Sequence, residues 1–398
     1  MKESIGARLD RRKGIGPGFD FLRIALSFSI LAYHSWVACG RDDDVSMGPA
    51  WILIYALLPM FFALSGFLIT GSAMRLRLRD FLINRGIRIL PALAVEIVLS
   101  AILLGPVFTV FPLSQYFADP KLALYFTNIL GLIRYQLPGV FLDNPLPDQV
   151  NVSLWTVPYE IVCYIAMAGM IIFGLLRRPK IVACAAGTLL VLSLALDIAV
   201  GDQSGGLVNR YVVHGLFLGR GGVLLPAFLL GSLIFLYRYK IPYDRRIFMA
   251  CLGVCLLATL VAGEDLLGGD HKVNNWAHPG VLALIFCPPL AYITAYVGVS
   301  DIAPVPLYSK GDYSYGVYLY GFPIQQSLSA IFPDISVASH LLASVVLSSL
   351  VAMGSWHFIE KPILRVRKRL TFMARKVEDQ PVDSPAQPAL VPASGAAK

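Results

Sequence analysis

An arginine and a histidine lie within the first long apolar stretch of the chain, from Phe19 to Ala38. A charged side chain inside a membrane span costs roughly 2.5–3.5 kcal/mol on insertion scales, so such residues usually serve a function. Arg23 and His34 are eleven residues apart, so in a helix both point the same way, about 17 Å apart along the axis. One helix face would therefore hold a cation near the inner surface and a proton-transfer group near the outer surface.

Two interpretations of His34 are open: a buried imidazole that hydrogen-bonds between helices, and a general base beside a cavity. Glu160 lies at the start of a later apolar stretch, at a depth that would let it meet His34 if the two helices pack together. A carboxylate beside an imidazole fixes its tautomer and stabilises the imidazolium. The sequence thus predicts a catalytic pair of His34 and Glu160, with a purely structural intramembrane pair as the alternative.

Arg85 and Arg88 are three residues apart at the inner start of the third apolar stretch, so both guanidinium groups share a helix face. Inner arginines often only fix the orientation of a membrane protein. They also suit phosphates, because the guanidinium group is a planar, forked donor. With Arg23 opening on the same side, the sequence predicts a cationic pocket that faces the cytoplasm.

The composition indicates the elements that must position these residues. Hydrophobic residues make up 57% of the 398-residue chain and charged residues only 15%, against about 25% charged in soluble domains. Stretches of about 20 apolar residues can cross a bilayer, where the backbone must be satisfied within helices. We therefore expect an all-α polytopic membrane bundle of about ten transmembrane helices. The segments are 19–38, 50–73, 89–110, 152–175, 180–199, 220–239, 246–263, 279–299, 314–332 and 337–358.

Arginine and lysine cluster in alternate connections, whereas the other connections are acidic or neutral. By the positive-inside rule, both termini are predicted to be cytoplasmic, and the net charge of +8 needs no nucleic-acid partner. We expect a basic leader at 1–18, a membrane domain at 19–365 and a disordered tail at 366–398. The outer connection 111–151 contains a short apolar piece, 122–133, expected to lie at the interface or dip back into the protein. The six cysteines have no zinc-site spacing, so no metal is expected.

Several segments, in order, resemble the acyltransferase-3 family of bacterial membrane proteins, and the resemblance covers about 19–365. The matching elements are Phe19-Asp20-Phe21-Leu22-Arg23, the spacing from Arg23 to His34, Phe61 to Leu68, Arg85-Gly86-Ile87-Arg88, Ser153 to Glu160, Tyr313 to Tyr320, and Glu360-Lys361-Pro362. One departure is Gly321, which stands where many members have a histidine.

This resemblance implies a multi-pass O-acyltransferase of the bacterial inner membrane. It implies that the donor is an acyl-CoA, usually acetyl-CoA, and that the acceptor is a carbohydrate hydroxyl. It assigns catalysis to His34, which Glu160 is expected to assist, and donor binding to Arg23, Arg85 and Arg88. A covalent acyl-histidine is an open alternative. The competing function is a transporter of a solute or lipid-linked sugar that uses the same intramembrane groups. The sequence leaves the acceptor, the acyl chain length and the oligomeric state open.

Overall fold

The fold is built from helices, as the apolar composition predicts. The computed structural model describes residues 3–46 (except 13 and 15), 51–200, 220–261, 279–303 and 311–370. Within these residues there is no β-strand. The connections at 201–219 and 262–278, which are predicted to be outer, and the predicted tail beyond residue 370 lie outside the described residues.

Each of the ten predicted segments is occupied by a helix. These are α2 (Pro17–Ala38), α4 (Trp51–Ala73), α5 (Leu78–Leu99), α9 (Val157–Ile172), α10 (Pro179–Val200), α11 (Gly221–Leu236), α12 (Arg245–Val261), α14 (Pro279–Gly298), α15 (Ser314–Ile331) and α16 (Val337–Ser355). Among the described residues, seven helical segments are long and apolar enough to cross a membrane, so the chain is a multi-pass membrane protein.

The predicted number of about ten spans is not confirmed, because three of these helices fall short in length or composition. α11 is apolar but has only 16 residues, about 24 Å, whereas the hydrocarbon core is about 30 Å thick. α12 has 17 residues. α15 has 18 residues but contains Gln325 and Gln326, which lower its hydropathy.

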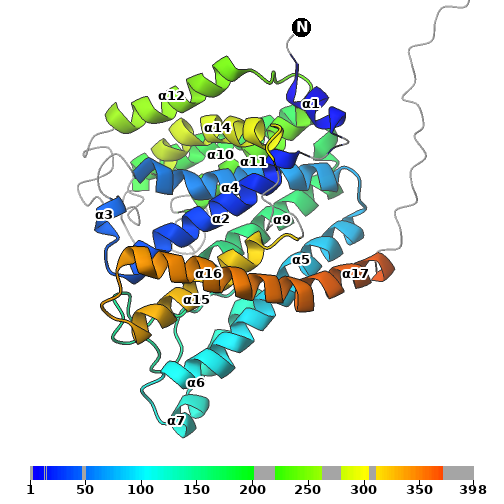
Figure 1. Cartoon of the computed structure of the whole chain (residues 1–398). Coiled ribbons are helices and arrows are strands. Elements are labelled where there is room, and N and C mark those ends of the chain that lie inside the picture. The colour runs from blue at the N-terminus through cyan, green and yellow to red at the C-terminus, as the bar shows by residue number, and fades with distance from the viewer. Residues whose placement is uncertain are drawn as a thin grey trace, which may run out of the picture.

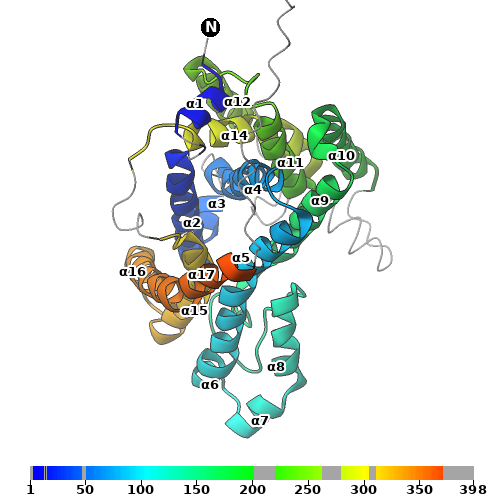
Figure 2. The same cartoon turned by 90° about the vertical axis from the view of Figure 1, so that its right-hand side faces the viewer.

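α4 lies in the middle of the bundle (Figures 1 and 2) and approaches α11 closely at two glycines. A Cβ added at Gly66 would lie 2.0 Å from the backbone oxygen of Phe228, and one at Gly231 would lie 1.9 Å from that of Ala63. Small residues such as the pair Ser65-Gly66 allow two helix backbones to approach this closely. This contact holds α4 in place as a wall of both pockets described below.

The third helix starts earlier than the sequence predicts. α5 begins at Leu78 rather than at residue 89, and it continues through a π-helical turn, η1 (Ser100–Leu104), into α6 (Gly105–Phe108). The apolar pattern misses the first turns because they carry polar residues such as Asp80 and Asn84. The whole segment has 31 residues and is therefore about 46 Å long. Arg85 and Arg88 thus lie within the helix rather than at its start.

The connection after α6 forms a lobe that projects from the bundle (Figure 2). The lobe contains α7 (Leu113–Ala118), α8 (Pro120–Tyr125) and the 3-10 turn η2 (Phe126–Leu130). The apolar piece at 122–133 therefore runs through α8 and η2, and it packs back against α9, since a Cβ added at Gly131 would lie 2.6 Å from Ile161 Cδ1. Asn151 anchors the end of this connection, since its Nδ2 donates to Glu96 Oε1 and to the backbone oxygen of Leu319, both at 2.9 Å. This anchor fixes the start of the next helix.

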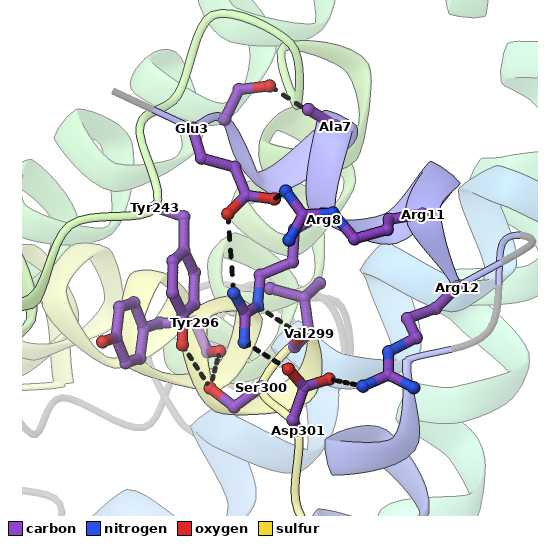
Figure 3. Close-up of polar contacts among 11 residues, drawn as sticks. Glu3, Ala7, Arg8, Arg11, Arg12, Tyr243, Tyr296, Val299, Ser300 and Asp301 are labelled. Atoms are coloured by element: carbon purple, nitrogen blue, oxygen red, sulfur yellow. Dashed lines mark hydrogen bonds and ion pairs between the residues drawn. The ribbon is translucent and has the colours of Figure 1, made fainter. Parts of the chain in front are cut away.

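The basic leader forms a packed helix, α1 (Ile5–Arg11), which buries Ile5 and Leu9. Arg8 donates to the backbone oxygen of Val299 at 3.0 Å and to Asp301 Oδ2 at 2.8 Å. Arg12 donates to Asp301 Oδ1 at 2.5 Å (Figure 3). These arginines therefore hold α1 against the bundle.

The two ends of the bundle differ in charge. Figure 1 shows α1, α17 (Lys361–Leu370) and the connection between α4 and α5 at one end, and α3 (Asp43–Ser46) at the other. We name them the basic end and the α3 end. The arrangement gathers basic connections at one end, as the positive-inside pattern requires, and the assignment of that end to the cytoplasm stays a prediction.

Candidate active site

An open cavity lies among α2, α4, α5, α9 and α15. Arg23, Arg85, Arg88 and Glu160 all line it, and we name it the arginine pocket. Including the open space at its mouth, it measures about 1030 Å³. The three arginines that the sequence assigns to donor binding thus meet in one cavity.

A carboxylate that the sequence analysis did not single out ties two of these arginines together. Asp312, just before α15, pairs with Arg88 and lies 3.2 Å from a guanidinium nitrogen of Arg23. Its other oxygen accepts a hydrogen bond of 2.6 Å from the hydroxyl of Ser314. Burial raises the pKa of Asp312, but the charges of Arg88 and Arg23 and the Ser314 hydroxyl outweigh it, so the pKa lies well below its usual value. Asp312 is therefore ionised and orients both guanidinium groups.

Arg85 differs from its neighbour because no acidic side chain among the described residues forms an ion pair with it. Its Nε is buried and has no hydrogen-bond partner in the described part of the chain. Its guanidinium lies 6.0 Å from the ring centroids of both Phe81 and Tyr164. A buried donor without a partner is costly, and a phosphate oxygen is a suitable partner for it.

Glu160 lies in the arginine pocket, not beside His34. Its Oε1 accepts a hydrogen bond from the hydroxyl of Tyr164, one turn further along α9. No hydrogen bond or ion pair joins Glu160 to His34, both of which the structure describes. The predicted pairing fails because α9 turns this carboxylate toward the arginines of α5.

A second cavity, the histidine pocket, opens at the α3 end of the bundle. Its lining includes Tyr33 and His34 of α2, Trp155 at the start of α9, and Arg220, which precedes α11. The His34 ring meets Phe322 edge-on, with centroids 5.2 Å apart.

The two nitrogens of His34 have different surroundings. Nδ1 of His34 lies 3.5 Å from Ser153 Oγ. Nε2 has no hydrogen-bond partner among the described residues, so it is the nitrogen available to a substrate hydroxyl.

A row of hydroxyl groups connects the two pockets. The hydroxyls of Thr156 and Tyr318, which line the arginine pocket, lie 2.7 Å apart. The Tyr318 hydroxyl also donates to the backbone oxygen of Ser153 at 2.8 Å, and the Ser153 side chain meets His34. Leu58 lines both cavities. Arg23 and His34 therefore share one helix, as predicted, and open into two neighbouring pockets.

Comparison with known proteins identifies the family. A family model described as an acyltransferase domain matches residues 17–357. The chain belongs to the acyltransferase-3 family. It is therefore an acyltransferase, and the competing interpretation as a transporter is not supported.

Relatives of this acyltransferase include three curated proteins. The chain is 26% identical over 348 residues to an O-acetyl transferase of Shigella phage Sf6, a match that covers 87% of this chain and 95% of the phage protein. It is 27% identical over 388 residues to nodulation protein 10 of Rhizobium leguminosarum bv. viciae, which covers 92% of this chain and 98% of that protein.

The third relative is longer. It is the "Putative peptidoglycan O-acetyltransferase YrhL" of Bacillus subtilis (strain 168), 26% identical over 368 residues. That match covers 87% of this chain but only 54% of the Bacillus protein. No solved structure matches the chain.

Three residues at the two pockets were not singled out as site residues from the sequence, although Tyr318 lies in the matching element Tyr313 to Tyr320. Asp312 and Tyr318 have no local pattern that reveals their contacts, since these depend on how α15 packs. Arg220 had a signal, because an arginine at a predicted outer span end departs from the positive-inside rule. Within the described residues, no group of three or more His, Cys, Asp or Glu is arranged to hold a metal ion.

Proposed function

We propose that this protein is a bacterial inner-membrane O-acyltransferase that moves an acyl group, usually acetyl, from acyl-CoA to a carbohydrate hydroxyl. The single observation that carries the proposal is the pairing of two pockets on one helix. Arg23 opens into a cavity with two more arginines, and His34 opens into the neighbouring cavity, about 17 Å away along α2.

The separation of the two pockets favours an acyl-CoA donor. Coenzyme A carries phosphates at one end and its acyl group at the far end of the extended pantetheine arm. Arg85 and Arg88 would bind the phosphates, since a forked guanidinium suits these oxygens, and Arg23 would complete the cationic wall. The arm would then run past Thr156 and Tyr318 toward His34, which a short donor could not reach.

In the reaction, His34 acts as general base. Its Nε2 takes the proton of the acceptor hydroxyl while the hydroxyl oxygen attacks the thioester carbonyl carbon. The C–S bond then breaks, and the imidazolium returns the proton to the thiolate, which leaves as free coenzyme A. Ser153, at Nδ1, holds the ring in orientation. An acyl-histidine intermediate would use the same nitrogen as nucleophile.

Glu160 serves the donor side in this proposal. Its position beside Arg85 and Arg88 and its hydrogen bond from Tyr164 suit a residue that limits the excess positive charge of the empty arginine pocket. Direct assistance to His34 would require contact between the two side chains, which their hydrogen bonds do not provide.

A carbohydrate acceptor is supported by the pocket and by one relative. Trp155 and Tyr33 line the histidine pocket, and their rings offer apolar faces to the C–H groups of a sugar. Peptidoglycan is the acceptor in the name of the Bacillus relative. We therefore propose a sugar hydroxyl on a surface glycan, lipid-linked precursor or oligosaccharide as the acceptor.

The proposal is tested by supplying acetyl-CoA labelled in its acetyl group to membranes that contain the full chain. Label should appear on carbohydrate in an ester that mild alkali removes. His34→Ala should abolish this labelling while the protein is still inserted at normal abundance. Equal labelling by the His34→Ala protein would overturn the mechanism. Acetyl esters that form on carbohydrate in membranes freed of acetyl-CoA would overturn the donor assignment.

A further inference from the structure

The histidine pocket contains a cation that the proposed mechanism does not use. Arg220 lines this pocket together with His34, at the α3 end of the bundle. Most of the arginine and lysine clusters of this chain gather at the opposite end, so orientation does not explain an arginine here. Arg41 also lies at the α3 end, but it is exposed and pairs with Asp44. A single guanidinium beside the proposed acceptor site needs another physical reason.

Arg220 is held by an aromatic ring and not by an acid. Its guanidinium carbon lies 4.1 Å from the centroid of the Trp155 ring. Within the described residues, no carboxylate lies within ion-pair distance of it, and no hydrogen bond uses its N–H groups. Asp44, an acidic residue of the same end, pairs with Arg41 at 2.6 Å. Stacking fixes the plane of the guanidinium and leaves its edges free for hydrogen bonds.

The charge of Arg220 acts on the surroundings of the pocket. Burial raises the pKa of Tyr135, and the positive charge of Arg220 opposes that rise. A positive group in a partly buried cavity attracts an anion more strongly than it would in water. A free guanidinium edge binds carboxylate and phosphate through two parallel hydrogen bonds.

We propose that Arg220 binds an oxyanion of the acceptor, either a sugar carboxylate or a phosphate, beside the hydroxyl presented to His34. The donor's phosphates cannot supply this anion if they occupy the arginine pocket, which lies about 17 Å away along α2. This inference rests on the proposed acyl transfer and adds to it the acceptor class: a glycan that is negatively charged close to the acylated sugar.

The test uses membranes that contain the full chain, labelled acetyl-CoA and three acceptors. The first is a neutral glucose oligomer, the second is an oligomer in which glucose alternates with glucuronate, and the third is the neutral oligomer linked to polyprenyl pyrophosphate. Arg220→Gln is compared with Arg41→Gln, which removes an exposed arginine from the same end of the bundle. Arg220→Lys retains the positive charge but lacks the planar guanidinium with its paired N–H donors.

We expect the wild-type chain to use one of the two charged acceptors with a KM at least tenfold below that of the neutral oligomer. A preference for the glucuronate oligomer would identify the anion as a carboxylate, and a preference for the polyprenyl-linked oligomer would identify it as pyrophosphate. Arg220→Gln should raise the KM for the preferred charged acceptor about tenfold, with kcat and the KM for acetyl-CoA unchanged. Arg220→Lys should have a KM for this acceptor between those of the wild type and Arg220→Gln. Arg41→Gln should behave as wild type.

Three results would overturn the inference. One is equal use of neutral and charged acceptors by the wild-type chain. A second is a loss of kcat on all acceptors in Arg220→Gln, which would indicate a role in the reaction itself or in folding. The third is transfer to none of the acceptors by the wild-type chain. The proposed function itself fails only if the labelling of membrane carbohydrate described above also fails, so the two failures are distinguishable.

Discussion

Arg85 and Arg88 share a helix face and a pocket, yet the structure predicts different consequences when each is replaced by glutamine. Arg85 has no acidic partner among the described residues, whereas Arg88 pairs with Asp312. A hydrogen bond to a charged group contributes about 1.5–3 kcal/mol. Arg85→Gln should therefore raise the dissociation constant of the donor about 10- to 150-fold, since about 1.4 kcal/mol is tenfold. The free energy of unfolding should hardly change.

Arg88→Gln should weaken donor binding by a similar factor and also destabilise the fold. Removing one partner of a buried ion pair costs about 3–5 kcal/mol. The side chains of Arg88 and Asp312 keep 26% and 21% of their exposure, and Arg23 remains near Asp312. We therefore expect a loss of about 1–3 kcal/mol in this variant.

The assay measures binding of an acetyl-CoA analogue in which a thioether replaces the thioester, so that no transfer occurs. Thermal unfolding of the purified full-length protein is measured in parallel. Arg75→Gln is the matched control, because Arg75 is exposed at the same end of the bundle, outside the arginine pocket. Unchanged donor affinity in Arg85→Gln would refute the donor site. Equal stability of Arg85→Gln and Arg88→Gln would refute the structural role of Asp312.

Three further predictions follow from the geometry of the two pockets. His34→Ala should abolish acyl transfer and leave the affinity for the donor analogue within about twofold of the wild-type value, since His34 lies outside the arginine pocket. A large loss of affinity would contradict two separate pockets. Ser153→Ala should lower kcat about 3- to 10-fold, because its contact with His34 is a single long hydrogen bond of 3.5 Å, and an unchanged kcat would remove Ser153 as a positioning residue. Gly66→Ala should destabilise the protein by about 1–3 kcal/mol, because the new Cβ would lie 2.0 Å from the Phe228 oxygen. This loss should appear as a lower melting temperature. An unchanged melting temperature would mean that α4 and α11 separate freely.

The sequence was a good guide to whatever depends on periodicity along one helix. The eleven-residue spacing of Arg23 and His34 sets their shared face, and both side chains open into cavities of the bundle. The three-residue spacing of Arg85 and Arg88 likewise places both side chains in the lining of the arginine pocket. The apolar segments indicated every long helix. The start of α5 was missed, because its first turns carry polar residues and an apolar pattern does not detect such turns.

The partners of these residues depended on packing between helices. Glu160 was expected beside His34, because both lie at comparable depths, but depth does not give the rotation of one helix against another. The structure turns Glu160 toward Tyr164 and the arginines and gives His34 the hydroxyl of Ser153.

The sequence by itself determined that this is a helical membrane protein, which residues share a helix face, and which family it resembles. These properties follow from composition, helical period and motif order along the chain. Only the tertiary structure decided that Asp312 joins Arg23 to Arg88 and that Arg220 shares a pocket with His34. Contacts between residues far apart in the chain depend on how each helix is rotated and how close it packs, and no local pattern encodes either.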